Sequence, residues 1–243
     1  MKIELHPLEQ FTIRPLVPLH LGKLDISFTN SALLMTLTVL AISAVVILGT
    51  RKEALVPGRW QSLGEMGYEF IAKLIDDTVG TEGQAYFPFI FTLFMFILFG
   101  NLLGLVPYGY TFTGQIIVTF AMAAVVFIGV TAIGIWRHGW HFLSFFVPKG
   151  VPVVLLILLV PIELLSYLIR PFTLSIRLFA NMLAGHTMLA IFGGFVGVVG
   201  LLGLIPLGVD VLLIFLEILV AVLQAYVFTI LTCLYLNDAI HLH

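Results

Sequence analysis

The feature that most constrains this chain is a stretch of 55 residues, from Val151 to Ile205, that contains no polar loop. As one straight helix it would be about 80 Å long, whereas the hydrocarbon core of a bilayer is only about 30 Å thick. Because 60% of the chain is hydrophobic and only 10% is charged, a soluble enzyme, a disordered tail and a nucleic-acid-binding protein are excluded. Two interpretations of the stretch stay open: a tight reversal at Arg170 and Pro171, or one kinked helix that lies steeply tilted.

Other largely apolar segments are also long enough to cross a bilayer, for which about 20 residues are needed. They predict an all-α polytopic membrane protein, in which residues 1–243 form a single membrane domain with about five membrane-crossing helices. The expected order is an outside N-terminal segment at 1–30, spans at 31–48, 86–107 and 113–135, an amphipathic helix at 61–79, and two long helices at 151–205 and 207–238.

The segment 61–79 differs from the spans because its apolar residues recur at helical spacing while charged residues occupy the other faces. This pattern predicts an amphipathic helix that lies at the surface or against a partner. Its apolar residues are Met66, Phe70, Ile71, Leu74 and Ile75.

The loops between the expected spans carry their lysines and arginines unequally. Six lie in the loops after the first and third spans, and three lie before the first span. Because loops rich in Lys and Arg stay on the cytoplasmic side, the N-terminus is expected outside and, after five crossings, the C-terminus inside. The inside set is Arg51, Lys52, Arg59, Lys73, Arg137 and Lys149, and the outside set is Lys2, Arg14 and Lys23.

Two of the 11 lysines and arginines, Arg170 and Arg177, remain within the long apolar stretch. An arginine at bilayer depth costs from about 3 to more than 10 kcal/mol, so it is retained only where it faces protein or water. Arg177 lies in mid-segment, and its guanidinium stays protonated and cannot relay a proton. It can instead ionise a nearby carboxylic acid and repel cations. The residues of the last two segments that can carry protons are Glu163, His186, Asp210, Glu217 and Asp238.

A seven-residue spacing gathers the polar residues of each long segment on one helix face. From Glu163 through Arg170 to Arg177, the direction in which the side chains leave the helix axis rotates by only about 40°. Thr173 and Asn181, four residues either side of Arg177, share this face. Two such stripes predict a lined aqueous path or a shared polar contact. The stripe of the last segment consists of Asp210, Glu217, Gln224 and Asp238.

Three of these residues lie at places where a structural role is also open. Arg170 and Asp238 lie near segment ends, from which they can snorkel to the interface. Asp210 follows a glycine-rich break and can cap the last helix. Arg177 has no comparable alternative.

Other polar residues can serve packing instead of transport. His186 can be a packing histidine, although the nearby acids favour a titrating role. Asn181 and Gln224 can hydrogen-bond between helices, each contact being worth about 1 kcal/mol. Cys233, the single cysteine, excludes an internal disulfide and is expected to be an apolar filler.

Residues 171–186, PFTLSIRLFANMLAGH, closely resemble the signature of the subunit a family of rotary F-type ATP synthases. A second run, Glu217 followed by LQAYVF at 223–228, is similar to the last helix of that family. The resemblance covers the whole chain, including the order of the spans and the C-terminal length.

The resemblance implies a stator channel that packs against the c-subunit ring, whose members each carry one carboxylic acid in mid-membrane. Arg177 matches the arginine that keeps this carboxylate ionised between two offset half-channels and prevents a proton short circuit. The last two segments then form a long tilted hairpin along the ring. Other positions also match: Asn181 and Gln224 lie beside the arginine, and Arg170 lies at the membrane boundary. The positions that line the half-channels are Glu163, His186 and Glu217. Further candidates are Thr173, Asp210, Asp238 and Asn101.

The implied partners are the c ring, b-type subunits of the peripheral stalk and the lipid bilayer of an energy-transducing membrane. A bacterial inner membrane is expected, with the N-terminus periplasmic and the C-terminus cytoplasmic. No cofactor, metal ion or nucleic acid is expected. The sequence has no GxxxxGK[ST] pattern, so ATP would be handled by partner subunits. The choice between protons and sodium ions depends mostly on the ring and stays open.

Two departures from the family pattern concern the proton path. Many bacterial relatives carry an acid at the position of His186 and a histidine at that of Glu217; the exchange found here is typical of mitochondrial and alphaproteobacterial-type members. Some relatives also carry an acid within 101–107, where this chain has Gly104 and only Asn101 as a weak substitute.

Two other functions remain as alternatives. One is a self-contained secondary transporter. Such a transporter is expected to contain internal repeats, which the sequence does not show. The other is a structural subunit of another respiratory complex, in which Arg177 pairs locally with Glu163 or Glu217.

Overall fold

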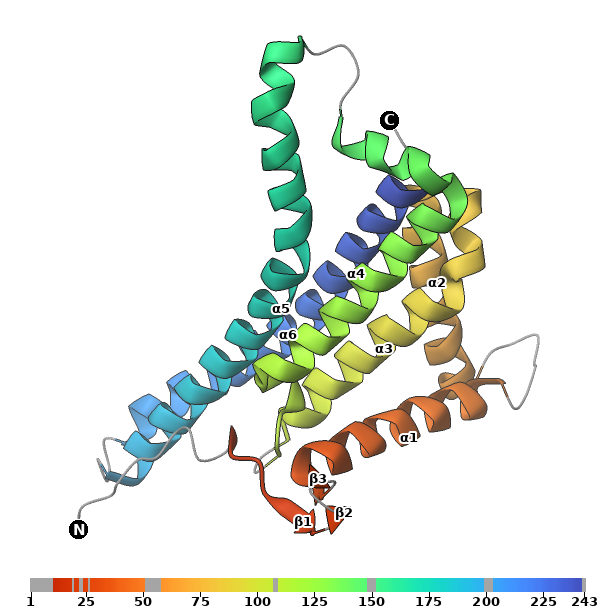
Figure 1. The fold of residues 1–243 in the computed structure, drawn as a ribbon. Helices are drawn as coiled ribbons and strands as arrows, with labels where there is room; N and C mark the ends of the chain where they lie inside the picture. The colour runs from red at the N-terminus through yellow and green to blue at the C-terminus, as the bar shows by residue number, and fades with distance from the viewer. Residues whose placement is uncertain are drawn as a thin grey trace.

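The computed structural model describes residues 11–18, 20–21, 24–25, 27–50, 58–106, 109–147, 152–198 and 203–241. These residues form a helical bundle with a few very short strands near the N-terminus (Figure 1). The α-helices are α1 (Asn30–Thr50), α2 (Arg59–Thr78), α3 (Phe87–Gly104), α4 (Ile116–His138), α5 (Val153–Val198) and α6 (Leu204–Ile240). The 3-10 helices are η2 (Thr81–Tyr86), η3 (Phe112–Gly114) and η4 (Gly139–Phe146), and the strands are β1 (Pro15–Val17), β2 (His20–Leu21), β3 (Leu24–Asp25) and β4 (Phe28–Thr29).

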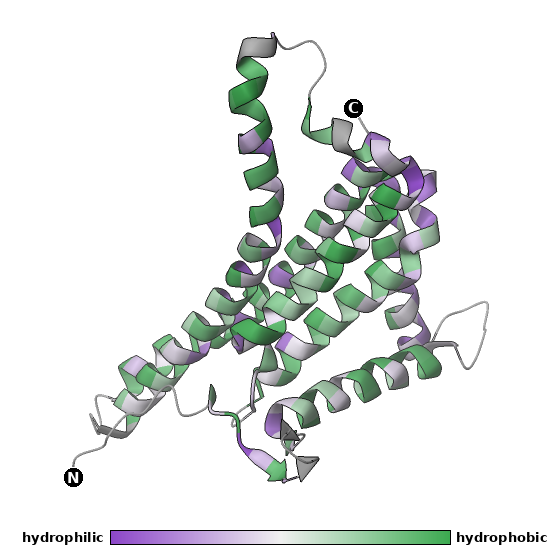
Figure 2. Cartoon of the chain, viewed as in Figure 1, coloured by the Kyte–Doolittle hydropathy of each residue, from purple (hydrophilic) through white to green (hydrophobic). Residues whose placement is uncertain are grey.

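The predicted fold class is confirmed, because five helices of the described residues are long and apolar enough to cross a membrane. These are α1, α3 extended by η2, α4 extended into η4, α5 and α6. Most of their residues are hydrophobic, as the green ribbons of Figure 2 show. Some of the expectations rest on residues that lie outside the described ranges. These residues are Lys2, Lys23, Arg51, Lys52, Pro107, Lys149, Val151 and residues 199–202.

Helix α5 decides between the two interpretations of the long apolar stretch. It continues for 46 residues through Arg170 and Pro171, so the tight reversal predicted as one alternative is wrong. Pro161 and Pro171 both lie inside the helix, and each removes one backbone hydrogen bond and favours a kink. Figure 1 shows the result: α5 bends midway, its first half stands apart, and its second half runs along α6.

The second half of α5 and the adjacent part of α6 are joined by a continuous buried seam. Leu174, Leu178 and Met182 recur every four residues on α5 and are almost fully buried. This spacing follows one face of an α-helix, so the three side chains point the same way. On α6 the matching face carries Ala221 and Ala225, whose small side chains let the two helices approach closely.

Helix α2 divides its apolar residues between two environments. Ile71, Leu74 and Ile75 are buried, and α2 packs on α3 and α6. Met66 and Phe70, which the periodicity assigned to the same face, are 65% and 43% exposed. The helix therefore uses one part of its apolar face for the bundle and leaves the other part on the surface.

Short strands in the N-terminal segment were not expected from the sequence. β1 pairs with β4 and β2 with β3, both antiparallel. Asn30 ties this segment to the start of α1: its side-chain oxygen accepts a hydrogen bond from the Arg14 backbone N–H at 3.1 Å, and its amide nitrogen donates to the Thr12 carbonyl at 3.1 Å. Gln115 donates to the Phe11 carbonyl at 2.6 Å, which anchors the segment beside η3.

Candidate functional site: a polar seam between α5 and α6

The buried seam ends in two titratable side chains, one from each helix. His186 lies four residues beyond Met182 on α5, and Glu217 lies four residues before Ala221 on α6. His186 Nε2 is 3.6 Å from Glu217 Oε1, and the two residues are 8% and 4% exposed. Helical spacing thus continues an apolar contact directly into an imidazole–carboxyl pair.

Gly185 allows the carboxyl group of Glu217 to approach α5. A Cβ atom at position 185 would lie 2.6 Å from Glu217 Oε1 and 2.9 Å from its Cδ. Real Cβ atoms do not tolerate such distances, so a residue without a side chain is needed here. The glycine therefore belongs to the site as much as the two titratable residues do.

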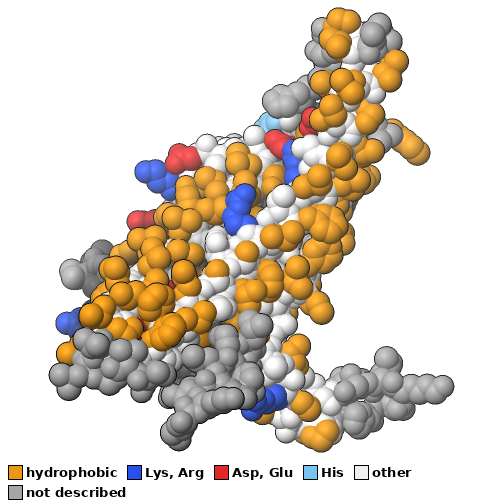
Figure 3. Space-filling view, turned by 90° about the vertical axis from the view of Figure 1, so that its left-hand side faces the viewer, with side chains coloured by type: hydrophobic (Ala, Val, Ile, Leu, Met, Phe, Trp, Pro, Cys, Tyr) orange, Lys and Arg blue, Asp and Glu red, His pale blue; other side chains and the backbone are white. Residues whose placement is uncertain are grey.

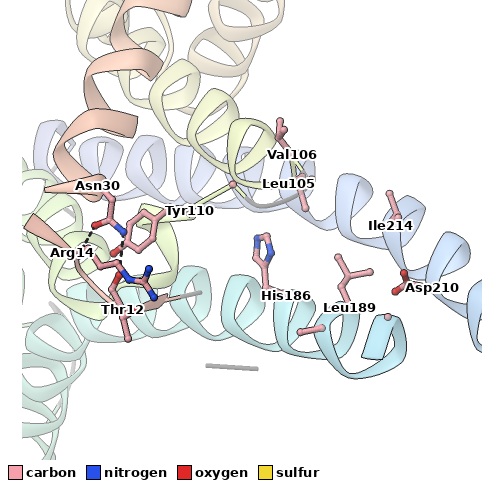
Figure 4. A pocket seen from close by; sticks show the side chains of 13 residues that line it. Thr12, Arg14, Asn30, Leu105, Val106, Tyr110, His186, Leu189, Asp210 and Ile214 are labelled. Atoms are coloured by element: carbon pink, nitrogen blue, oxygen red, sulfur yellow. Dashed lines mark hydrogen bonds between the residues drawn. The ribbon is translucent and has the colours of Figure 1, made fainter. Parts of the chain in front are cut away.

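A cavity of about 850 Å³ opens beside His186, at the end of the bundle where the N-terminal segment lies (Figure 4). Its walls come from α5, α6, the connection between α3 and α4, the start of α1 and the N-terminal segment, and Asp210 lies on the α6 side. Burial raises the pKa of the Tyr110 phenol above its ordinary value, so this lining group stays neutral. The polar or titratable residues of the lining are Thr12, Arg14, Asn30, Tyr110, His186 and Asp210.

Asn181 and Gln224 form a second polar contact across the seam, nearer the middle of both helices. Asn181 donates from Nδ2 to Gln224 Oε1 at 2.8 Å. Gln224 is 1% exposed, whereas Asn181 lies at the surface of α5. The sequence predicted that both could connect helices, and here they connect the buried seam to the outer face of α5.

Arg177 lies one helical turn from Asn181 and is exposed. Within the part of the chain that the structure describes, its guanidinium has no hydrogen bond and no ion pair. Phe172 and Ile176 nearby are each 52% exposed, and Thr173 and Asn181 are exposed on the same face as Arg177. Figure 3 shows one face of the molecule, on which a few charged side chains lie among many hydrophobic ones. A fixed charge on such a face is suited to a partner that carries the opposite charge.

Arg170 and Asp238 form an ion pair with each other. From the sequence, we also expected that each could extend separately to the membrane interface. Arg170 Nη1 donates to Asp238 Oδ2 at 3.0 Å, and both side chains are partly buried. The guanidinium also lies over the rings of Tyr235 and Tyr167, at 4.8 and 5.2 Å from the centroids. Such contacts stabilise a cation through the ring quadrupole. The pair therefore joins the bend of α5 to the end of α6.

Two further candidates form no hydrogen bond with the imidazole–carboxyl pair within the described residues. Thr173 bonds to its own helix, at the carbonyls of Ile169 and Arg170. Asp210 lines the cavity but does not cap α6, whose N-cap is Gly203, so the capping alternative is wrong.

Glu163 and Asn101 lie on other parts of the bundle. Glu163 is partly exposed on the first half of α5. Asn101 is fully buried and donates to the Ala221 carbonyl at 3.3 Å, which makes it a link between α3 and α6.

Sequence reasoning missed Thr111, although it touches His186. Thr111 Oγ1 lies 2.7 Å from His186 Nε2, and the residue is 2% exposed. The cavity residues of the N-terminal segment were also missed. A polar run in the short connection between two spans, YTFTG at 110–114, was the available signal. Its position relative to α5 depends on tertiary packing.

This arrangement can transfer protons between the cavity and the interior of the bundle. His186 borders the cavity, and its Nε2 atom faces the carboxyl group of Glu217. Within the described residues, both oxygens of Glu217 lack a hydrogen-bond partner. Imidazole and carboxyl groups both gain and lose protons, so the two can pass a proton between them.

Comparison with known proteins gives one consistent result. Residues 32–237 match the family described as ATP synthase A chain. The chain is 56% identical to ATP synthase subunit a of Paramagnetospirillum magneticum over 245 residues, which cover 98% of this chain and 99% of that protein. It is 54% identical to ATP synthase subunit a of Pelagibacter ubique over 242 residues, or 98% of each chain. For the protein of that name from Rhodospirillum rubrum the identity is 55% over 240 residues, or 98% and 99% of the two chains. With a match of this length and similarity, the chain belongs to the ATP synthase A chain family.

Proposed function

We propose that the chain is the proton-translocating stator subunit of an F-type ATP synthase and that it provides two offset half-channels to the carboxylates of a c-subunit ring. Family membership connects it with ATP synthesis and proton transport in an energy-transducing membrane. The observation that carries the proposal is the buried His186–Glu217 pair beside a cavity, together with an exposed Arg177 on the same helix as His186.

One half-channel begins at the cavity. A proton that enters there meets His186 at the wall and Glu217 behind it, 3.6 Å away. The contact between Gln224 and Asn181 then leads from the seam toward the outer face of α5. Because Asn30 and Arg14 line the cavity, this half-channel opens on the side of the N-terminal segment, which we assign to the periplasm.

The second half-channel is assigned to the opposite side of Arg177. Along α5, Glu163 lies about 21 Å before Arg177 and His186 about 14 Å beyond it, at 1.5 Å per residue. Titratable groups therefore flank the arginine in both directions. Arg170, seven residues after Glu163, pairs with Asp238 near the end of α6. This pair supports an end of the path on the cytoplasmic side, together with the C-terminus.

Arg177 separates the two half-channels in this proposal. A ring carboxylate that loses its proton near one half-channel would be held ionised by the guanidinium, because an opposite charge favours the charged form. The same fixed charge repels protons and other cations that would cross directly. Its lack of an internal partner within the described residues supports this role and disfavours the alternative in which Arg177 pairs with Glu163 or Glu217.

The experiment is Arg177→Ala in the reconstituted ATP synthase complex, with Arg137→Ala as the matched control. Arg137 is also an arginine, but it pairs with Glu82 on the surface, where both side chains are about half exposed. ATP-driven acidification of vesicles and the passive proton leak under an imposed potential are measured. We expect Arg177→Ala to abolish pumping with the leak unchanged or raised, whereas the control pumps normally. Normal pumping by an assembled Arg177→Ala complex would refute the proposal.

A further inference from the structure

Thr111 is a buried hydroxyl that lies outside the long helices and yet reaches their titratable pair. It precedes η3, in the connection between α3 and α4, and its backbone carbonyl accepts a hydrogen bond from Gly114 N at 3.0 Å. This bond holds the residue in place while its side chain points to α5. Thr111 Oγ1 and His186 Nε2 are 2.7 Å apart, a normal hydrogen-bond distance.

Gly104, at the end of α3, leaves the space that Thr111 occupies. A Cβ atom at position 104 would lie 2.4 Å from Thr111 Oγ1, 2.8 Å from its Cγ2 and 3.0 Å from its Cβ. Each of these atoms would have to move if position 104 carried a side chain. The glycine and the threonine therefore form one structural unit that brings a hydroxyl to His186.

The chemistry of the hydroxyl matches a ring whose protonation changes. A threonine hydroxyl can donate to an unprotonated Nε2 and can accept from a protonated one, simply by rotating its hydrogen. An ionised carboxylate can only accept, and Glu217 lies 3.6 Å from the same nitrogen, beyond a good hydrogen bond. On another side of the imidazole, the ring of Phe11 makes an edge contact with a centroid distance of 6.1 Å.

We infer that Thr111 is a positioning residue for proton transfer: its hydrogen bond to Nε2 holds the imidazole of His186 beside the carboxyl group of Glu217 in both protonation states of the imidazole. This inference rests on the proposed function, because it assumes that His186 carries protons from the cavity to Glu217. It concerns a residue outside the two sequence runs that carry the family resemblance. Without the hydroxyl, the ring can turn toward the cavity and lose its alignment with the carboxyl group.

Two substitutions of opposite character test the inference in the reconstituted complex. Thr111→Val keeps the shape of the side chain and removes the hydroxyl, whereas Thr111→Ser keeps the hydroxyl and removes a methyl group. A packing role predicts that Val is tolerated better than Ser, and the positioning role predicts the reverse. We expect Thr111→Val to slow ATP-driven pumping and passive conduction through the membrane sector about fivefold, and Thr111→Ser to keep most of the wild-type rate.

Further variants make each outcome decisive. Gly104→Ala should reproduce the loss seen in Thr111→Val and add little to it in the double variant, because both remove the same contact. Thr36→Val is the matched control, since the Thr36 hydroxyl bonds to the Ala32 carbonyl of its own helix at 2.8 Å. If Thr111→Val does not assemble, Thr111→Ala replaces it, because it removes the same hydroxyl without adding volume.

The inference is overturned if Thr111→Val, or Thr111→Ala in its place, conducts as well as Thr111→Ser. Arg177→Ala, measured in parallel, separates this result from a failure of the proposed function. If Arg177→Ala also pumps normally, the stator function itself is wrong. If Arg177→Ala is inactive while Thr111→Val is normal, the positioning role alone is wrong.

Discussion

A methyl group at Gly185 should disrupt the imidazole–carboxyl pair without removing either member. In Gly185→Ala the new Cβ would meet Glu217 Oε1 at 2.6 Å, its Cδ at 2.9 Å and its Cγ at 3.2 Å. Because ordinary contacts begin at 3.4 Å, the carboxyl group must retreat by about 0.8 Å. The helices cannot separate easily, since Met182 and Ala221, which continue the seam, are both fully buried.

The displaced carboxyl group should transfer protons poorly to and from His186. A misplacement near 1 Å lowers the rate of a positioned reaction by up to about 100-fold, so we expect pumping to fall about 10- to 100-fold. The assay is ATP-driven acidification at equal amounts of assembled complex. Gly129→Ala is the control, because a Cβ there meets nothing within 4 Å. Wild-type pumping by Gly185→Ala would show that the 3.6 Å approach of the two groups does not matter for transport.

Two further predictions concern other parts of the site. Asp238→Asn should destabilise the folded complex by about 1–2 kcal/mol, because it leaves Arg170 without its partly buried partner. In a thermal inactivation assay, the charge exchange Arg170→Asp with Asp238→Arg should recover part of the lost stability. No recovery would argue against a direct pair. Ala190→Cys, in the cavity wall, should react with a membrane-impermeant maleimide from the periplasmic side, while the buried Cys233 stays unmodified; labelling from the cytoplasmic side alone would reverse the proposed orientation.

The membrane class and the five spans were predictable from the sequence because they depend on local properties. An apolar run of sufficient length has to be helical in a bilayer, whatever else it touches, since its backbone groups find no other hydrogen-bond partners. The seven-residue spacing likewise predicted that Glu217 and Gln224 share one face of α6. Both residues are buried against α5 in the structure.

The continuity of α5 was not predictable in the same way. A proline such as Pro171 can end a helix or only kink it, and the outcome depends on the contacts around it. Here Pro171 is buried, and the Arg170–Asp238 contact bridges residues 68 positions apart. That contact exists only because α6 returns beside the bend.

What the sequence determined by itself is therefore the inventory of the site: an arginine, a histidine and several acids on apolar helices, where each is costly and must have a use. The tertiary structure alone decided which of them meet. His186 finds Glu217 on the next helix and Thr111 at a separation of 75 residues, in the space left by Gly104. Such contacts depend on how whole helices pack, and no local periodicity in the sequence records this packing.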